Sequence, residues 1–454
     1  MCLDEPCAEE ERPRSKSMED YECLDVDYSR AVPLEPFIHQ VGGHSSMMRF
    51  DEHTVCKPMI SREHHFYLSL PKNLRKFSPE YRGVIQVSFQ EDKDGFIRLV
   101  AHPCETNHSG GHSESDSSPA GSAEEDNVSS ASSVHRTKRR RRRKEKETGI
   151  NTNEITHSVP LCDCVLSNGR RRWSWPPVRV RLLRTGSIEV QSNGTGPFLV
   201  DLVENKEEAE SLKGLGHNPW SLRCHKKQLA EMRKTAPNSK LHKFILLENV
   251  TSQFVYPCIL DLKMGTRQHG DDATEEKRNR QMEKCASTTS ASIGVRVCGM
   301  QVYKAETGHF LCRNKYYGRK LTEDGFKHTL QQFLDNGQDV VAPKIIAQLQ
   351  ELKSILEKHQ TYRFYSSSLL IIYEGNNCWG GANRVENEDL CASHRAAGVA
   401  VKMIDFAHST YKGFRGDRTV HQGPDKGYIF GLENLLRVFH EIVEERGIVD
   451  EHDT

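Results

Sequence analysis

A carboxylate and an ammonium group stand two residues apart in the stretch PCILDLKMG, residues 257–265. The apolar residues before Asp261 are typical of a buried strand, and successive side chains of a strand point to opposite faces. Asp261 and Lys263 are therefore expected to share one face. Opposite charges placed side by side on a buried strand indicate a site for a polar ligand.

A second apolar run ends in an aspartate, at Asp405 in the motif IDF. Two strands that end in carboxylates, with a lysine beside one of them, are typical of a nucleotide–metal site, because Mg²⁺ needs only one or two carboxylates besides phosphate oxygens. Read alone, Asp405 is a weak signal, because an aspartate after a strand is usually a helix cap or a turn residue.

A third candidate pair is Lys57, in VCKPM, and Glu63, in REHHFY. Lys57 is expected on a strand and Glu63 at the start of a helix. In protein kinases a strand lysine paired with a helix glutamate holds the nucleotide phosphates. The alternative is a surface lysine and an unrelated glutamate. Gly42 and Gly43 do not form GxGxxG, so the protein-kinase form of the loop is not expected.

A cationic helix is expected over residues 272–287, with Asp272 and Glu275 as its capping box. Four polar residues at i, i+3, i+4 and i+7 share one face of this helix. They are Lys277, Arg280, Gln281 and Lys284. The face is either an anion-binding wall or an ordinary solvated surface.

Composition restricts the class of protein. The chain has 63 Lys+Arg and 63 Asp+Glu, so a general nucleic-acid binder and DNA-specific binding are not expected. The sequence contains no run of about 18 apolar residues, so no membrane span is expected. The acidic first residues contain no apolar stretch of the kind found in signal peptides. The 14 cysteines have no framework spacing and indicate reduced thiols in a cytoplasmic or nuclear protein.

The order of predicted elements divides the chain into five parts. We predict a disordered N-terminus at 1–30, N-terminal-lobe strands and a helix at 31–103, and a mostly disordered insertion at 104–215. The remainder of the N-terminal lobe, the hinge, the cationic helix and the C-terminal lobe occupy 216–446, before a tail at 447–454. The insertion contains a basic run, 138–144, which is a nuclear localisation signal, an anion-binding patch or a solvated charge block.

Several motifs occurring in order carry a family resemblance. PxxxDxKxG, SSLL and IDF together resemble the inositol polyphosphate kinases, and seven longer stretches resemble the inositol hexakisphosphate kinases within that family. These stretches are LEPFIHQVGGH, HNPWSLRCHK, DLKMGTRQHGDDA, RNKYYGRKL, YRFYSSSLL, MIDFAHS and GYIFGLENL. The resemblance covers roughly residues 33–103 and 216–446. It implies an α+β, two-lobed kinase-like fold with antiparallel sheets and an ATP cleft between the lobes.

The resemblance also implies roles for the residues on the nucleotide side. Asp261 would bind the ribose hydroxyls, Lys57 the ATP phosphates with Glu63 orienting it, and Asp405 the Mg²⁺. Glu248, Asn249 and Val250 in LLENV would bind the nucleotide, with backbone hydrogen bonds from Glu248 and Val250 to adenine. ATP and Mg²⁺ are the implied cofactors.

On the acceptor side, the resemblance places Lys263 at the junction of the ATP γ-phosphate and the inositol phosphate, and His408 against the substrate. The cationic helix face would be the substrate-binding face. The implied substrates are inositol hexakisphosphate and inositol pentakisphosphate, and the products diphosphoinositol phosphates. We expect a cytoplasmic and nuclear monomer, with protein partners of the insertion as a possibility.

A phosphate acceptor is already anionic, so no general base is needed. The sequence agrees, since His394-Arg395 lacks the aspartate of an HRD catalytic loop. Two alternatives stay open: a multikinase acting on ring hydroxyls of lower inositol phosphates, and a kinase-fold adaptor without activity.

Overall fold

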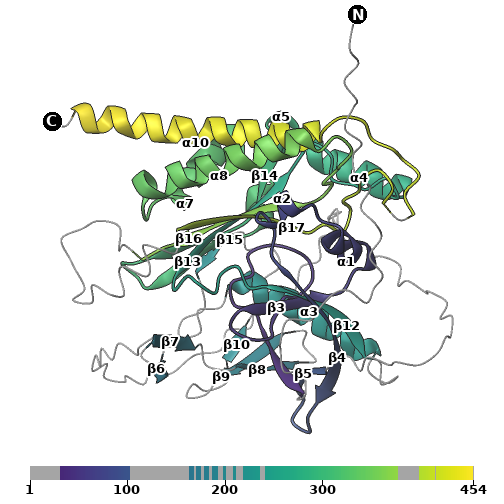
Figure 1. The fold of residues 1–454 in the computed structure, drawn as a ribbon. Coiled ribbons are helices and arrows are strands. Elements are labelled where there is room, and N and C mark those ends of the chain that lie inside the picture. Colours follow the sequence, from purple (N-terminus) through teal and green to yellow (C-terminus); the bar gives the residue numbers. More distant parts are fainter. Residues whose placement is uncertain are drawn as a thin grey trace, which may run out of the picture. The chain divides into compact units, whose positions relative to one another are not determined.

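In the computed structural model, two antiparallel sheets and their covering helices form the described part of the chain (Figure 1). The structure describes residues 31–102, 163–167, 170–174, 178–183, 187–192, 198–200, 208–210, 218–235, 241–376, 398–414 and 416–452. The predicted N-terminus 1–30, the basic run 138–144 and most of the loop between 376 and 398 lie outside these residues.

Six strands of the first sheet close into a ring. The sheet has the order β1-β2-β3-β12-β4-β5-β8-β9-β10, and β1 also pairs with β5. One half of β5 pairs with β1 and the other half with β8, so the sheet continues beyond the ring. Its strands are β1 (Val32–Pro36), β2 (Met48–Arg49), β3 (Thr54–Pro58), β12 (His242–Glu248), β4 (Tyr81–Glu91), β5 (Phe96–His102), β8 (Val178–Leu182), β9 (Ile188–Ser192) and β10 (Phe198–Val200).

The second sheet has the order β11-β15-β14-β13-β16-β17, and all its neighbouring strands are antiparallel. These strands are β11 (Glu208–Glu210), β15 (His309–Arg313), β14 (Val295–Lys304), β13 (Pro257–Met264), β16 (Ser368–Glu374) and β17 (Val399–Ile404). A separate hairpin pairs β6 (Asp163–Ser167) with β7 (Arg170–Ser174). β13 is paired on both edges, which makes it a rigid support for the charged residues it carries.

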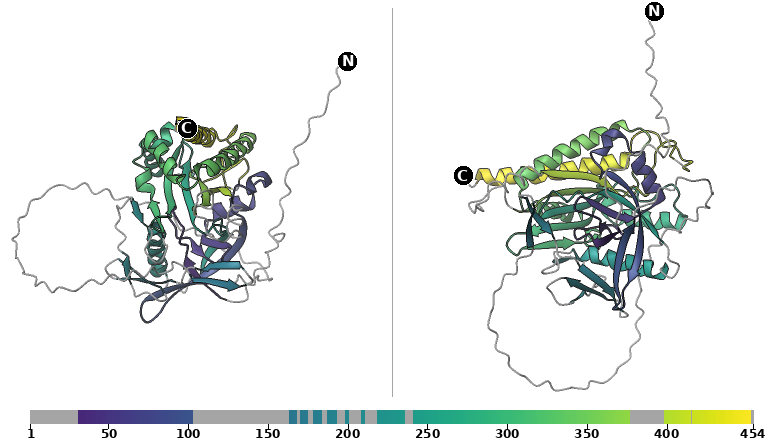
Figure 2. Two further views of the ribbon diagram at one scale, coloured as in Figure 1. Left: turned by 90° about the vertical axis from the view of Figure 1, so that its left-hand side faces the viewer. Right: turned by 60° about the horizontal axis from the view of Figure 1, so that its bottom comes forward.

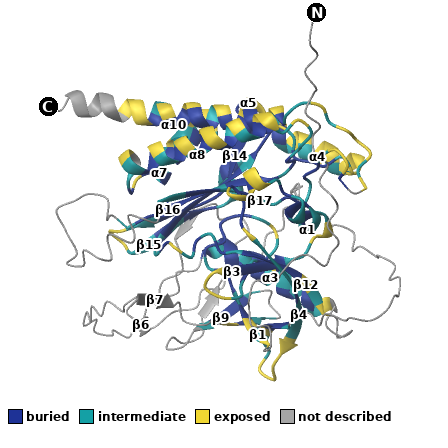
Figure 3. Cartoon of the chain, in the orientation of Figure 1, coloured by how far each residue is buried: buried dark blue, intermediate teal, exposed yellow. Residues whose placement is uncertain are grey.

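Long helices cover the second sheet. α7, α8 and α10 pack against its strands, and α8 lies beside α10 (Figures 1 and 2). The helices are α1 (Ser61–Leu68), α2 (Lys72–Arg75), α3 (Pro219–Thr235), α4 (Glu275–Ala286), α5 (Thr289–Ser292), α6 (Lys315–Gly318), α7 (Glu323–Phe333), α8 (Gln338–Lys358) and α10 (Lys426–His452). Buried residues line the sheets and the inner sides of these helices (Figure 3).

β13 shows the predicted alternation. Cys258, Leu260 and Leu262 point into the largest apolar core, whereas Ile259 belongs to a different cluster on the other face. Asp261 and Lys263 therefore share the face of Ile259, as the period of two requires. They lie within the strand rather than after it.

The insertion 104–215 is predicted as mostly disordered, and most of it lies outside the described residues. Its described part includes β8 and β9, whose alternating residues bury Val180, Ile188 and Val190 in the core of the first sheet. Two other boundaries predicted from the sequence are wrong. The tail 447–454 is helical as far as His452 because α10 continues through it. α4 begins at Glu275, since the Thr274 side chain, rather than Asp272, accepts the Lys277 N–H.

Candidate functional site

The site is centred on a buried lysine between two carboxylates. β3 presents Lys57, α1 presents Glu63, and Asp405 follows the last residue of β17. Lys57 Nζ lies 2.8 Å from Glu63 Oε1 and 2.8 Å from Asp405 Oδ1. The side chains of Lys57, Glu63 and Asp405 are 10%, 1% and 33% exposed. The structure thus unites the Lys57–Glu63 pair and Asp405, which are far apart in the chain.

Burial and charge determine the protonation of this triad. Burial favours uncharged Lys57, but Asp405 and Glu63 outweigh it and raise the pKa of Lys57. Burial would also raise the pKa of Asp405, yet Lys57 and Lys263 lower it to about 2. Burial raises the pKa of Glu63 although Lys57 opposes the shift. Asp405, the most accessible of the three, therefore remains an anion at neutral pH.

Asp405 has an unusual backbone conformation. Its φ is 63°, in the left-handed region that non-glycine residues rarely adopt. The next residue is held tightly: the Phe406 N–H donates to Glu63 Oε1 at 3.2 Å, and the Phe406 ring stacks on Phe66 of α1 at 4.9 Å. Such strain persists where the surroundings enforce it, and it is concentrated at functional sites.

Asp261 and Lys263 complete the charged cluster. Asp261 is 2% exposed, and its Oδ1 has no partner among the described residues. Burial and then the charge of Asp405 raise the pKa of Asp261 to about 6, against the influence of Lys263. A Cβ at Gly42 would lie 1.8 Å from Asp261 Oδ2, so backbone packs directly on this carboxylate.

Residues 248–250 comprise the last residue of β12 and the first two of the segment that leads to the second sheet. The Glu248 N–H donates to the Glu80 carbonyl at 2.8 Å, and the Asn249 N–H donates to the His53 carbonyl at 2.7 Å. The Asn249 side chain is also engaged, with the Glu52 carbonyl and Thr251. Asn249 therefore shapes the turn. Among the described residues, the Val250 N–H has no partner and is available to a ligand.

His408 connects the cluster with the cationic face of α4. Lys277 Nζ lies 3.4 Å from His408 Nε2, and His408 Nδ1 is buried without a partner among the described residues. Burial and then Lys277 lower the pKa of His408 to about 4. Arg280 is exposed, while Gln281 and Lys284 are half-buried on the same helix face.

These groups fit a Mg²⁺–nucleotide. Asp405 Oδ1 accepts from Lys57, whereas Oδ2 has no partner among the described residues. The described part of the chain contains no cluster of three metal-ligating side chains. One free carboxylate oxygen beside a lysine suits a metal that takes its other ligands from phosphate and water. The unpartnered Asp261 oxygen suits a hydroxyl donor.

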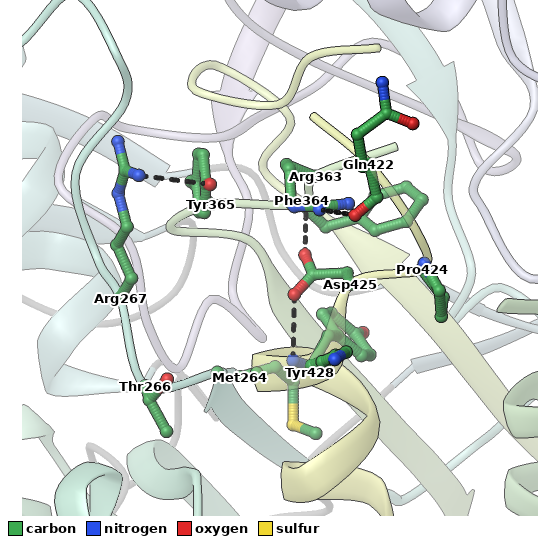
Figure 4. A pocket seen from close by; sticks show the side chains of 13 residues that line it. Met264, Thr266, Arg267, Arg363, Phe364, Tyr365, Gln422, Pro424, Asp425 and Tyr428 are labelled. Carbon is green, nitrogen blue, oxygen red and sulfur yellow. Dashed lines mark hydrogen bonds between the residues drawn. The ribbon is translucent and has the colours of Figure 1, made fainter. Parts of the chain in front are cut away.

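A cavity of about 230 Å³ lies elsewhere, between residues 264–267, 363–365 and 422–428 (Figure 4). Several of its polar groups are engaged with one another. The Asp425 carboxylate accepts from the Phe364 and Tyr428 N–H groups, and Arg267 Nη1 donates to the Tyr365 hydroxyl at 3.2 Å. None of the residues predicted for the site lines it.

The sequence analysis missed residues that hold the site from outside. Arg62 and Asp417 form an ion pair 355 positions apart, and Gln40 braces the loop that places Gly42 on Asp261. Glu374 accepts the Val255 and Tyr256 N–H groups between residues 248–250 and β13. No local spacing marks these residues, because their partners are distant in the chain.

The described part of the chain contains no helix long and apolar enough to span a bilayer.

Known proteins resemble this chain over most of its length. The family model for inositol polyphosphate kinase matches residues 244–440. Inositol hexakisphosphate kinase 1 of Rattus norvegicus is 46% identical over 441 residues, covering 92% of this chain and 95% of that protein. Inositol hexakisphosphate kinase 3 of Homo sapiens is 42% identical over 433 residues, covering 92% of this chain and 97% of that protein.

One similar solved structure is that of the inositol phosphate multikinase Ipk2 of S. cerevisiae in complex with ADP and Mn²⁺. It is 28% identical, with a TM-score of 0.36, and the alignment covers 44% of this chain and 84% of that chain. The near full-length relatives confirm the resemblance that the motifs indicated. By its sequence along nearly its whole length, the chain belongs to the inositol hexakisphosphate kinases of the inositol polyphosphate kinase family.

Proposed function

We propose that this kinase transfers the γ-phosphoryl group of ATP to a phosphate of inositol hexakisphosphate, and also of inositol pentakisphosphate, to form diphosphoinositol phosphates such as 5-diphosphoinositol pentakisphosphate. The main support for the proposal is that the Lys57–Glu63–Asp405 triad, Lys263 and the cationic face of α4 lie in one charged cluster. The names of the relatives supply the substrate class.

Charge explains why such an acceptor suits this site. Each phosphate monoester carries about −1.5 to −2 at neutral pH, so six carry roughly −9 to −12. Lys263, Lys277, Arg280 and Lys284 provide positive charge, and Gln281 provides an amide. The acceptor oxygen is already anionic and needs no general base. Catalysis then depends on positioning and charge neutralisation.

His408 fits the role of a neutral hydrogen-bond donor. With a pKa of about 4 it is uncharged at neutral pH. The ammonium of Lys277 donates toward Nε2, which assigns the ring proton to Nδ1. The unpartnered Nδ1–H can donate to a phosphate oxygen. His408 would therefore orient the substrate without accepting its proton.

On the nucleotide side, Lys57 would bind the ATP phosphates and Glu63 would orient its ammonium group. The Glu248 carbonyl and the Val250 N–H would contact adenine, and Asp261 the ribose. Asp405 would hold Mg²⁺ through its accessible oxygen. When bound, Mg²⁺ neutralises charge on the phosphate oxygens around the transferred group.

A substrate panel tests the proposal. Purified protein is incubated with ATP and Mg²⁺, and with each inositol phosphate from tris- to hexakisphosphate, and products are separated by anion exchange. We expect a more anionic product from the hexakisphosphate, and none from Asp405→Asn. Phosphorylation of lower inositol phosphates alone would support the multikinase alternative. No product from any of them would support the adaptor.

Location and assembly are part of the same proposal. We propose a monomer. We also propose that it works in the cytoplasm and the nucleus, and the basic run 138–144 and the 14 cysteines without framework spacing support this location. Fluorescence imaging of a tagged chain, with the basic run changed to alanines, tests the nuclear part. Unchanged nuclear signal would contradict the role of the run.

A further inference from the structure

Two neighbouring residues of α1 contact the segment that carries Asp405 and His408. Glu63 accepts the Phe406 N–H at 3.2 Å. Arg62 Nη2 donates to the Ser409 carbonyl at 3.1 Å. These contacts fall on either side of His408. The helix that orients Lys57 through Glu63 therefore also forms these two hydrogen bonds to the candidate metal-binding and substrate-binding segment, in addition to the stacking of Phe66 on Phe406.

Arg62 is held in this position by Asp417. Its Nη1 and Nη2 lie 2.7 Å and 2.5 Å from the two carboxylate oxygens, which is the bidentate geometry of strong guanidinium pairs. The side chains of Arg62 and Asp417 are 18% and 9% exposed. The Thr410 hydroxyl also donates to Asp417, and the guanidinium lies 4.8 Å from the Phe414 ring centre.

The segment needs such support. Asp405 is in the left-handed region with a φ of 63°, although it is not glycine. Aspartate adopts this conformation more readily than most residues, but the conformation still costs free energy and is maintained by the neighbours. Glu63 holds the segment directly after Asp405, and Arg62 with Asp417 holds it beyond His408. The Thr410 and Arg363 backbones also pair at 2.8 Å, so loss of the Arg62–Asp417 pair is expected to loosen the segment around Ser409 without releasing it, while Lys57 and Glu63 remain paired.

We propose that Arg62 and Asp417 form a positioning pair that keeps Asp405 oriented for Mg²⁺–nucleotide and His408 oriented for the acceptor. The proposal rests on the function proposed above. It assigns to both residues an action through the segment 405–409, without contact to substrate. Partners of this kind that orient a metal ligand typically affect metal affinity by about 10- to 100-fold.

The test compares Asp417→Asn and Arg62→Lys with a matched control in the full-length protein. The control is Arg181→Lys, because Arg181 pairs with Glu189 at 2.6 Å in the first sheet, on strands remote in sequence from the site. ATP affinity is measured by titration calorimetry with Mg²⁺ and with chelator, and thermal unfolding is recorded for each variant. Arg62→Lys retains one ionic contact and gives a milder disturbance if Asp417→Asn fails to fold.

For the two site variants we expect the Mg²⁺-dependent gain in ATP affinity to fall about tenfold or more. Affinity without Mg²⁺ should stay within about twofold, because Lys57 and Glu63 are unchanged. The control should retain the full gain. An intact gain in a folded variant would overturn the proposal. So would an equal loss with and without Mg²⁺, which indicates a purely structural pair.

The Mg²⁺-dependent gain in ATP affinity tests the Arg62–Asp417 pair independently of the proposed inositol phosphate kinase activity. A wild-type protein that gives no inositol phosphate product, while its variants lose the Mg²⁺-dependent gain, would contradict the function and support the pair. A wild-type protein that forms the product, with variants that keep the gain, would support the function and contradict the pair.

Discussion

Replacing Lys57 by methionine tests the buried triad directly. Methionine preserves most of the side-chain volume but leaves two carboxylates without their cation. Glu63, 1% exposed, cannot regain water, whereas Asp405, 33% exposed, can do so in part. Removing one partner of a buried ion pair typically costs about 3–5 kcal/mol. Because Asp405 recovers some hydration, we expect about 3 kcal/mol of lost unfolding free energy at pH 7.

Glu63 explains most of this expected loss. A second substitution, Glu63→Gln, removes its charge while its amide oxygen can still accept the Phe406 N–H. Neutral replacement of both members of a buried pair is often close to neutral in stability. The double variant Lys57→Met/Glu63→Gln should therefore be more stable than Lys57→Met alone, by about 1–2 kcal/mol.

The assay is urea unfolding at pH 7 and at pH 5.5. Lower pH protonates Glu63 in the single variant, so its deficit relative to the wild type should narrow. Lys304→Met is the control, because it breaks a surface pair with Asp335 whose side chains are 30% and 47% exposed. That change should cost less than about 1 kcal/mol. A loss for Lys57→Met no larger than the control, or no recovery in the double variant, would refute this reasoning.

Three further predictions concern the nucleotide, pH and the substrate. Gly42→Ala should weaken ATP binding by about tenfold or more in calorimetry, because its Cβ would lie 1.8 Å from Asp261 Oδ2; unchanged affinity would contradict this. Burial lowers the pKa of His39 to about 3, so the unfolded chain binds a proton that the folded protein does not. The free energy of unfolding therefore decreases as pH falls below about 6.5. Between pH 7.5 and 5.5, His39 should account for about 1.4 kcal/mol of this decrease, and His39→Gln should remove that part in urea unfolding. A decrease of the same size in the variant would contradict a neutral His39. Arg280→Gln should raise KM for inositol hexakisphosphate several-fold more than for a trisphosphate, whereas equal changes would argue against a charge-reading role.

The charged elements of the site were predictable because their signals are local or rest on the resemblance. Period-two alternation predicted that Asp261 and Lys263 share a face, and β13 confirms it. The strand-like stretch VCKPMI and the helix-like stretch SREHHFYLSL predicted a strand lysine and a helix glutamate, and β3 and α1 confirm both positions. Lys57 and Glu63 lie 2.8 Å apart. The functional roles of these residues remain predictions.

The supports of the site were not predictable from the sequence. Arg62 and Asp417 meet only because the chain folds back over 355 positions. The left-handed conformation of Asp405 accompanies tertiary contacts at Phe406, which no local sequence signal reveals. β8 was not assigned as a strand because five alternating residues are a weak signal inside a long polar segment. Local propensity is a weak guide where packing decides.

The most direct test of the proposed reaction is the ³¹P NMR spectrum of the product formed from inositol hexakisphosphate with ATP and Mg²⁺. We expect phosphoanhydride signals from the wild type, and none from Lys263→Ala whose circular dichroism and unfolding match the wild type. A product that contains only phosphate monoesters, or normal turnover by folded Lys263→Ala, would contradict the assignment of this site to phosphoryl transfer onto a phosphate.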